Sequence, residues 1–141
     1  MIVLDTNIVS ELMHVEPDPA VVSWLDAQQA PTLYITAVTA AELLFGVERM
    51  PSGKRRARIA SAIADMLEYD FADRVLPFDV SSSLEYGRIV AHREQLGHPI
   101  GMADTMIAAT ALSAGASLFA TRNTNDFTDT DLPLINPWIT Q

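Results

Sequence analysis

Apolar and polar residues alternate along the chain in blocks that predict short strands, each followed by a helix. The first block is the apolar run Ile2–Leu4, which meets a polar turn at Asp5–Asn7 and continues into apolar residues at helical spacing. Similar units recur to the end of the chain. The pattern predicts strands at residues 2–4, 33–35, 74–78, 117–120 and 133–137, and helices at residues 8–13, 21–28, 37–50, 54–69, 81–97 and 102–114.

Alternating strands and helices are typical of an α/β protein, in which helices cover both faces of a parallel sheet. We expect one domain over residues 1–141, with no internal repeat or linker. The helix at 37–50 has apolar residues around nearly its whole circumference, which predicts that it is buried. Thr36 is its expected N-cap, and Gly115 is expected to close the last helix.

Length and composition narrow the class of protein. Of the 141 residues, 49% are hydrophobic, which is enough for one folded core and argues against disorder. The formal charge of −9 disfavours nucleic-acid binding through an extended basic surface. The absence of cysteine excludes disulfides, thiol nucleophiles and cysteine-ligated metals. With neither a signal peptide nor a membrane-spanning apolar run, the sequence predicts a cytoplasmic protein without membrane contact.

Three acidic residues stand alone among apolar neighbours. Asp5 follows the first strand, Glu42 lies within an apolar helix, and Asp104 lies near the start of another. A carboxylate in such surroundings destabilises the fold unless it is paired, protonated or bound to a cation. Ordinary structural roles are the alternative. Asp5 suits a helix cap, Thr39 and Glu42 form a capping-box pattern, and a first-turn aspartate favours the helix dipole.

The conjunction of the three carboxylates favours a shared site. Ligand sites in open parallel sheets form beyond the carboxyl ends of the strands, where Asp5 lies and where the following helices begin. No lysine or arginine in these segments is a local counter-ion, so converging carboxylates would raise one another's pKa unless a cation joined them. Oxygen ligands select Mg²⁺ or Mn²⁺ over zinc. Such a cation serves phosphoryl or phosphodiester chemistry.

Two other families that place ligands beyond the first strand are disfavoured. An enzyme that forms a phospho-aspartate needs a lysine on a later strand, whereas Lys54, the only lysine, lies between a loop and a helix. A dinucleotide-binding fold needs a G-x-G-x-x-G motif after the first strand, and the sequence has none there.

Several short motifs follow one another in a distinctive order. They are Ile2-Val3-Leu4-Asp5-Thr6-Asn7, Ala41-Glu42-Leu43 before Phe45-Gly46-Val47, Ala103-Asp104 before Ile107-Ala108-Ala109-Thr110-Ala111, Ala120-Thr121-Arg122-Asn123 before Asp126-Phe127, and the closing Asn136-Pro137-Trp138. Together they resemble the PIN-domain ribonucleases of VapC type, the toxin halves of bacterial toxin–antitoxin pairs, and within them the FitB-like branch. The resemblance covers essentially the whole chain.

The resemblance implies a three-layer α/β/α fold with a short, mainly parallel five-stranded sheet. It also implies an endoribonuclease dependent on Mg²⁺ or Mn²⁺, in which metal-activated water cleaves RNA. By carry-over, Asp5 and Asp104 ligate the metal, and Glu42 completes the pocket directly or through a coordinated water. The sequence departs from many relatives at Asn123, where they have aspartate, and Asp126 is the candidate for the fourth acid. The number of metals stays open.

Residues beside these acids have two interpretations each. Thr6 and Thr121 either donate hydrogen bonds to the carboxylates or act as ordinary caps and strand-end hydroxyls. Arg122 either binds substrate phosphate or neutralises Asp126. The sequence alone does not choose between them.

The resemblance also implies partners. Relatives form homodimers within larger complexes and are inhibited by a cognate VapB- or FitA-like antitoxin, which projects an arginine toward the acids and supplies the only contact with DNA. The alternative to an RNA-cleaving toxin is a weakly or non-cleaving FitB-like partner in a DNA-bound complex that controls transcription. Asp5, Glu42 and Asp104 favour the nuclease, whereas Asn123 keeps the alternative open.

Basic residues are concentrated within ten positions, which suggests an RNA-phosphate contact or simply a solvated helix face. They are Arg49, Lys54, Arg55, Arg56 and Arg58. If this basic cluster binds RNA, replacing Arg55 and Arg56 by glutamate weakens binding and flattens its salt dependence, as filter binding across a salt series would show. Unchanged affinity at every salt concentration would eliminate the RNA contact.

Overall fold

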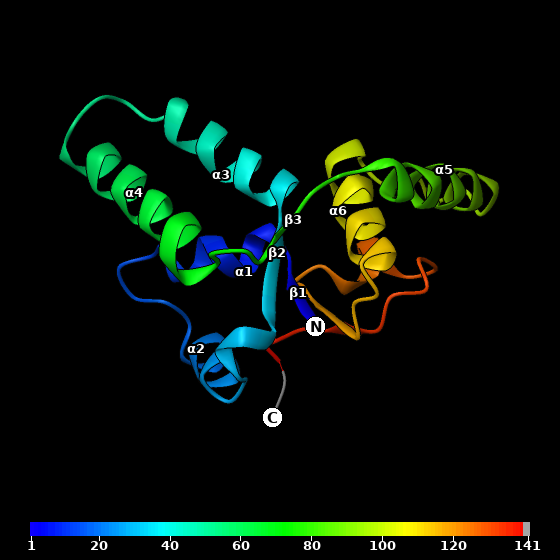
Figure 1. The fold of residues 1–141 in the computed structure, drawn as a ribbon, viewed down its shortest axis with the longest axis horizontal. Coiled ribbons are helices and arrows are strands. Elements are labelled where there is room, and N and C mark those ends of the chain that lie inside the picture. The colour runs from blue at the N-terminus through cyan, green and yellow to red at the C-terminus, as the bar shows by residue number, and fades with distance from the viewer. Residues whose placement is uncertain (140–141) are drawn as a thin grey trace.

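The computed structural model describes residues 1–139, within which a central sheet is flanked by helices (Figure 1). The strands are β1 (Ile2–Leu4), β2 (Leu33–Thr36), β3 (Val75–Leu76), β4 (Leu118–Ala120) and β5 (Leu134–Ile135). The α-helices are α1 (Thr6–Leu12), α2 (Pro19–Asp26), α3 (Ala37–Glu48), α4 (Lys54–Asp65), α5 (Val80–Gln95) and α6 (Met102–Ser113). Short 3-10 helices cover Ala30–Thr32 and Thr124–Phe127, and a π-helical turn, Met66–Asp70, extends α4.

The five strands pair in the order β3-β2-β1-β4-β5, and every pairing is parallel. β1 is therefore the central strand, with Val3 opposite Tyr34 of β2 and Phe119 of β4. The chain leaves β1 toward β2 on one side and later returns to β4 on the other. In such sheets this change of direction opens a crevice at the carboxyl ends of the two diverging strands. Asp5 and Thr121 directly follow β1 and β4 at that point.

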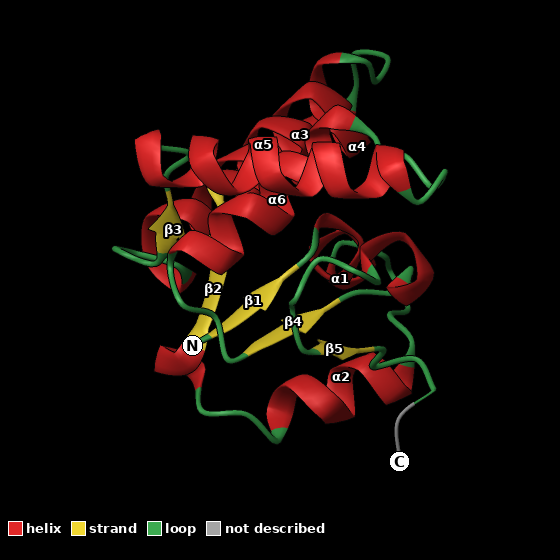
Figure 2. Ribbon diagram, turned by 90° about the vertical axis from the view of Figure 1, so that its right-hand side faces the viewer, coloured by secondary structure: helices red, strands yellow, loops and turns green. Residues whose placement is uncertain are grey.

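The two faces of the sheet support separate hydrophobic cores, because successive strand residues point to opposite sides. Leu4, Ile35 and Ala120 pack with residues from α1, α2, α3 and α4. Val3 and Phe119 pack on the other side with residues from α5 and α6. Figure 1 shows α3 and α4 on one side of the strands and α5 and α6 on the other, and Figure 2 shows β1, β4 and β5 side by side in the sheet. The expected three-layer α/β/α fold with a five-stranded sheet is confirmed, and the sheet is wholly rather than mainly parallel.

Polar residues begin several helices as the sequence pattern predicts. The Asp5 carboxylate accepts a hydrogen bond from the Thr6 amide and begins α1, and the Thr36 hydroxyl accepts one from the Thr39 amide and begins α3. At the other end of α6, Gly115 has a φ of +78°, a conformation that glycine adopts without the steric cost of a side chain. These caps set where each helix starts relative to the sheet.

The prediction that the helix at 37–50 is buried is wrong. In α3 only Thr39, Leu43 and Val47 are buried, whereas Leu44 is 47% and Phe45 is 61% exposed. The helix packs through one side on α1, α4, α6 and β2, and its apolar outer side meets no other described segment. The apolar residues of this helix therefore did not show that another segment covers them.

Other segments differ from the prediction in smaller ways. The helix predicted at 54–69 is α-helical only to Asp65 and widens into the π-helical turn, and the strands predicted at 74–78 and 133–137 shorten to Val75–Leu76 and Leu134–Ile135. Within residues 1–139, no helix is both long and apolar enough to cross a membrane.

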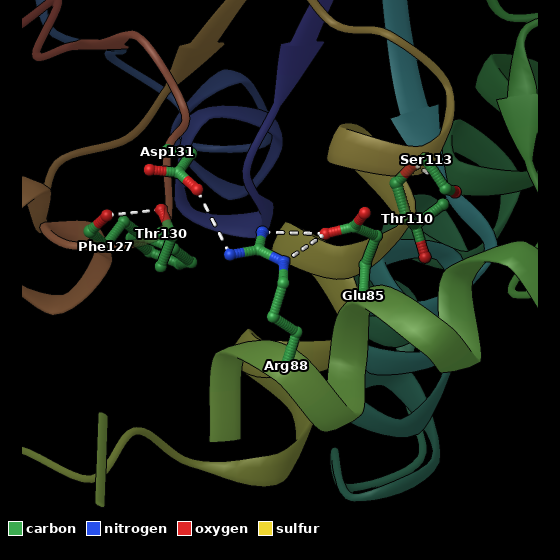
Figure 3. Close-up of polar contacts among 7 residues, drawn as sticks. All are labelled: Glu85, Arg88, Thr110, Ser113, Phe127, Thr130 and Asp131. Atoms are coloured by element: carbon green, nitrogen blue, oxygen red, sulfur yellow. Dashed lines mark hydrogen bonds and ion pairs between the residues drawn. The ribbon is translucent and has the colours of Figure 1, made fainter. Parts of the chain in front are cut away.

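Helix α5 is tied to the loop that precedes β5. The Arg88 guanidinium contacts the Glu85 carboxylate at 2.7 Å and the Asp131 carboxylate at 3.1 Å, while the Thr130 hydroxyl donates to the Phe127 carbonyl (Figure 3). The Arg88–Asp131 ion pair joins this loop to α5, whereas the Thr130 hydrogen bond lies within the loop itself.

Replacing Phe119 by alanine should lower the free energy of unfolding by about 3–5 kcal/mol, because it leaves a cavity beside Phe127. Phe119 is fully buried, and its ring centroid lies 4.8 Å from that of Phe127. The matched control is Phe45→Ala, an exposed position where a change of about 0.5 kcal/mol or less is expected. Urea unfolding measures both values, and equal losses would contradict this account of the core.

Candidate active site

Asp5 is a buried carboxylate at the carboxyl end of the central strand, with only 4% of its surface exposed. One carboxylate oxygen accepts from the Thr6 amide at 2.8 Å, and the other accepts from the Thr121 hydroxyl at 2.7 Å. The Asn7 amide nitrogen lies 3.4 Å from this second oxygen. Asp5 can therefore cap α1 and line the site at the same time, because its two carboxylate oxygens accept hydrogen bonds from different partners.

Glu42 is oriented by α1 rather than by a cap of its own helix. The Thr6 hydroxyl donates to the Glu42 carboxylate at 2.6 Å, and the same hydroxyl lies 3.0 Å from that of Thr39. The capping-box alternative for Thr39 and Glu42 is not what the structure shows, since the N-cap of α3 is Thr36. Glu42, in the second turn of α3, instead turns toward the end of β1.

Asp104 enters from the opposite helical layer, in the first turn of α6. With Asp5 and Glu42 it lines a pocket of about 360 Å³ beyond the carboxyl ends of β1 and β4. The structure thus brings together three carboxylates that are 37 and 62 residues apart along the chain. The remaining lining residues are Thr6, Asn7, Ser10, Glu11, His14, Arg122, Asn123 and Trp138.

The three carboxylates influence one another electrostatically. Burial is the largest cause that raises the pKa of Asp5 to about 6, with smaller increases from the charges of Asp104 and Glu42 and opposing effects of its Thr121 and Thr6 hydrogen bonds. Burial also raises the pKa of Asp104, and the charges of Glu42 and Asp126 raise it further. Asp5 and Asp104 therefore lose favourable solvation and are repelled by neighbouring acids, which a cation between them would relieve.

The donor set of the pocket fits a hard divalent cation with part of its water shell. Carboxylate oxygens are the ligands that Mg²⁺ and Mn²⁺ prefer, and Mg²⁺ commonly binds one or two protein carboxylates together with waters. Within residues 1–139, no three Asp, Glu or His side chains are close enough to enclose an ion by themselves. The chemistry thus fits an open site, in which water completes the coordination, better than a closed all-protein cage.

The remaining predicted site residues lie at different depths. Thr121 is fully buried behind Asp5, where its hydroxyl donates to Asp5 and accepts from the Asn123 amide. Asn123 is exposed and lines the pocket. Asp126 does not line it; it is exposed on the following 3-10 helix and borders a different surface depression, although its charge reaches Asp104.

Sequence reasoning missed Asn7, Glu11 and Trp138 as pocket residues. Glu11 is 8% exposed, and contacts with the Asp18 amide, His14 and Trp138 outweigh burial and lower its pKa. Burying an acid among polar groups leaves no mark in the hydrophobic pattern, which is why Glu11 looked like an ordinary helix residue. The signal that could have identified Asn7 is its position, since it is a polar residue only two places after Asp5.

Two neighbouring arginines of the basic cluster, Arg55 and Arg56, have different surroundings in the structure. The Arg56 guanidinium contacts the Glu48 carboxylate at 3.1 Å and the Met50 carbonyl, so its charge is already matched. Arg55 instead lines a pocket of about 250 Å³ that shares Thr6, Ser10, His14 and Glu42 with the acidic pocket.

Comparisons with known proteins place this architecture in one family. The PIN-domain family model matches residues 2–132. The chain is 48% identical to the VapC ribonuclease Y4jK of Sinorhizobium fredii over 138 residues, which is 98% of each chain. It is 37% identical to the toxin FitB of Neisseria gonorrhoeae over 98% of this chain and 99% of that one. The chain belongs to the PIN-domain family, among its VapC-type toxin ribonucleases.

The solved structures agree with this assignment. The chain superimposes on the structure of FitAB bound to the IR36 DNA fragment with a TM-score of 0.93, at 35% identity and covering 100% of this chain and 98% of the other. The predicted relation to VapC-type and FitB-like PIN proteins is therefore confirmed over the full length of the relatives.

The pKa of Asp5 predicts that this PIN domain becomes less stable as pH rises from about 4 to about 6. In this window the folded protein holds a proton that the unfolded chain, with an ordinary pKa of 3.8, has released. The difference between pKa values of 3.8 and about 6 corresponds to about 3 kcal/mol of unfolding free energy. Urea unfolding at several pH values in a chelator measures the effect.

Asp5→Asn should remove this part of the pH dependence. Asp79→Asn is the matched control, because Asp79 also caps a helix but lies outside the acidic pocket. A slope in Asp5→Asn equal to that of the wild type would contradict the burial of an ionisable Asp5.

Proposed function

We propose that this VapC-type PIN protein is an endoribonuclease dependent on Mg²⁺ or Mn²⁺, which hydrolyses RNA phosphodiesters as the toxin of a toxin–antitoxin pair. The observation that carries the proposal is the convergence of Asp5, Glu42 and Asp104 in one pocket beyond the carboxyl ends of β1 and β4. Relatives over the full length of the chain bear the names VapC ribonuclease and toxin FitB.

In this proposal Asp5 and Asp104 hold the divalent cation, and Glu42 completes the site directly or through water. The cation supplies binding of phosphate oxygens and a lowered pKa for the attacking water. The protein's own part is to keep the carboxylates in place. The Thr121 hydroxyl and the Thr6 amide hold Asp5, and the Thr6 hydroxyl holds Glu42. A nucleophilic side chain is unnecessary, since water attacks phosphorus.

The proposal includes a protein partner. We infer that the chain binds a VapB- or FitA-like antitoxin, reaches DNA only through it, and forms a homodimer within that complex. The similarity to FitAB bound to DNA supports this inference. So do a largely apolar pocket of about 700 Å³ between α1, α2 and the end of α4, and the exposed Leu44 and Phe45 of α3.

One observation favours a second function, that of a weakly cleaving partner in a DNA-bound complex controlling transcription. Asn123 supplies no charge to the pocket, and Asp126 does not line it. The candidate metal ligands are then three acids, Asp5, Glu42 and Asp104. Glu11 also lines the pocket, but its carboxylate contacts the Asp18 amide and His14. Lower activity than in relatives with a fourth acid would follow from the smaller charge available to hold metal.

The test is inducible expression without antitoxin, comparing the wild type with Asp5→Asn and Asp104→Asn. The wild type should arrest growth and create new RNA 5′ ends, and each substitution should abolish both, because each removes a metal-binding charge. The purified wild type should cut RNA with Mg²⁺ and not with a chelator.

Asp79→Asn is again the matched control, since it changes a helix-capping aspartate outside the pocket and should leave cleavage intact. If the wild type and both pocket variants give the same RNA ends, the nuclease proposal is wrong. Arrest that persists in Asp104→Asn without new RNA ends would favour the second function.

A further inference from the structure

Among the described residues 1–139, Arg122 is the only lysine or arginine that lines the acidic pocket. Its side chain is exposed, and within residues 1–139 no carboxylate forms an ion pair with it. Arg88 and Arg56 are different, because each contacts a carboxylate within 3.1 Å. Because no ion pair joins Arg122 to Asp126 in the described part of the chain, the structure favours the interpretation in which Arg122 binds phosphate.

The main chain of Arg122 is fixed from both sides. Its amide donates to the side-chain oxygen of Asn7 at 3.3 Å, and its carbonyl accepts from the side-chain nitrogen of Asn136 at 3.1 Å. Asn7 also contacts Asp5 and Thr121. The position of Arg122 is thus tied to the carboxylate at the centre of the proposed metal site.

The Arg122 side chain is oriented by the closing Asn-Pro-Trp motif. The Trp138 amide donates to the Asn136 side-chain oxygen at 3.0 Å, and the Arg122 guanidinium lies 5.0 Å from the centre of the Trp138 ring. An aromatic face attracts a guanidinium but leaves its N–H edges free to donate. Trp138 itself lines the pocket beside the acids. The motif therefore holds a cation at the pocket without neutralising it.

A guanidinium without a carboxylate partner at this position can offset the repulsion between the acids and RNA phosphate. RNA phosphate is repelled by a pocket lined with carboxylates, and arginine binds phosphate through two parallel N–H groups. Because the side chain is already oriented by the indole ring, binding costs less conformational entropy.

We propose that Arg122 is the phosphate-binding residue of the acidic pocket, contacting a phosphodiester of the RNA, and that Trp138 is a positioning residue that orients Arg122. The inference rests on the proposed function and names the residue through which the negatively charged substrate is held beside Asp5 and Asp104.

The experiment measures affinity for a short single-stranded RNA in the Asp104→Asn background, across a salt series with Mg²⁺ present. Arg122→Gln should weaken binding about tenfold, as expected for one charge-assisted hydrogen-bonded contact. The slope of log affinity against log salt should fall in magnitude by about 0.7, the value for one phosphate contact on a single strand. Arg122→Lys should retain part of the affinity, because it keeps the charge.

Trp138 is tested by a double-mutant cycle. Trp138→Ala should weaken binding in the Asp104→Asn background but have little further effect once Arg122→Gln is present. Trp138→Phe should retain most of the affinity, because its ring still attracts the guanidinium and fills much of the same space. Thermal unfolding of each variant checks that the fold is kept. An equal loss from Trp138→Ala in both backgrounds would show that the indole acts independently, by stacking on a base, and would overturn the positioning role.

Arg88→Gln is the matched control, because it removes an exposed arginine outside the pocket whose charge is already paired (Figure 3). It should leave affinity and salt slope unchanged. An effect of Arg88→Gln equal to that of Arg122→Gln, or no effect of Arg122→Gln on either quantity, overturns the proposal.

RNA cleavage, measured in protein that is otherwise wild type, distinguishes failure of the Arg122 phosphate contact from failure of the nuclease proposal. If Arg122→Gln cuts RNA with unchanged KM, the phosphate contact is wrong and the nuclease stands. If the wild type does not cut but Arg122-dependent binding persists, the nuclease is wrong and the contact stands.

Discussion

Asp5 is a carboxylate buried at the end of the central strand, and the surrounding elements are arranged so that this position can tolerate charge. Burial opposes its ionisation, whereas the Thr121 hydroxyl and the Thr6 amide favour it. Both donors are supplied by the segments directly after β4 and β1. The parallel pairing of these two strands is therefore what makes the buried carboxylate possible, and the pocket forms around it.

The same polar contacts link the pocket to distant parts of the chain. Asn7 joins Asp5 to Thr121 and to the main chain of Arg122, and Asn136 joins that main chain to the C-terminal segment. Residues near both ends of the chain thus share one network, because β1, β4 and β5 are neighbours in the sheet. The same network brings opposite charges together, because the pocket is lined by Asp5, Glu11, Glu42 and Asp104 and also by Arg122, the proposed phosphate-binding residue.

Much of the fold and part of the site could be predicted from the order of residues alone. Asp5, Glu42 and Asp104 were predicted as site residues because each stands alone among apolar neighbours, where a charge is unfavourable unless it is paired or bound to a cation. Asn7 and Trp138 lay within the motifs that carried the family resemblance, but nothing in the pattern marked them as pocket residues, since polar turns and single aromatic residues are common in any fold. Their roles depend on which distant atoms they meet, and the local pattern holds no information about that.

The sequence by itself determined the α/β class, the approximate strands and helices, and the helix caps, because these depend on local periodicity and short-range hydrogen bonds. Only the tertiary structure decided that α3 has one exposed apolar side, that Glu42 accepts a hydrogen bond from Thr6, and that the Arg122 guanidinium lies over the Trp138 ring. Apolar periodicity reports which residues avoid water, but the presence of a neighbouring surface depends on how the whole chain packs. The partner of a polar side chain is likewise set by contacts between segments more than a hundred residues apart, such as Asp5 and Thr121.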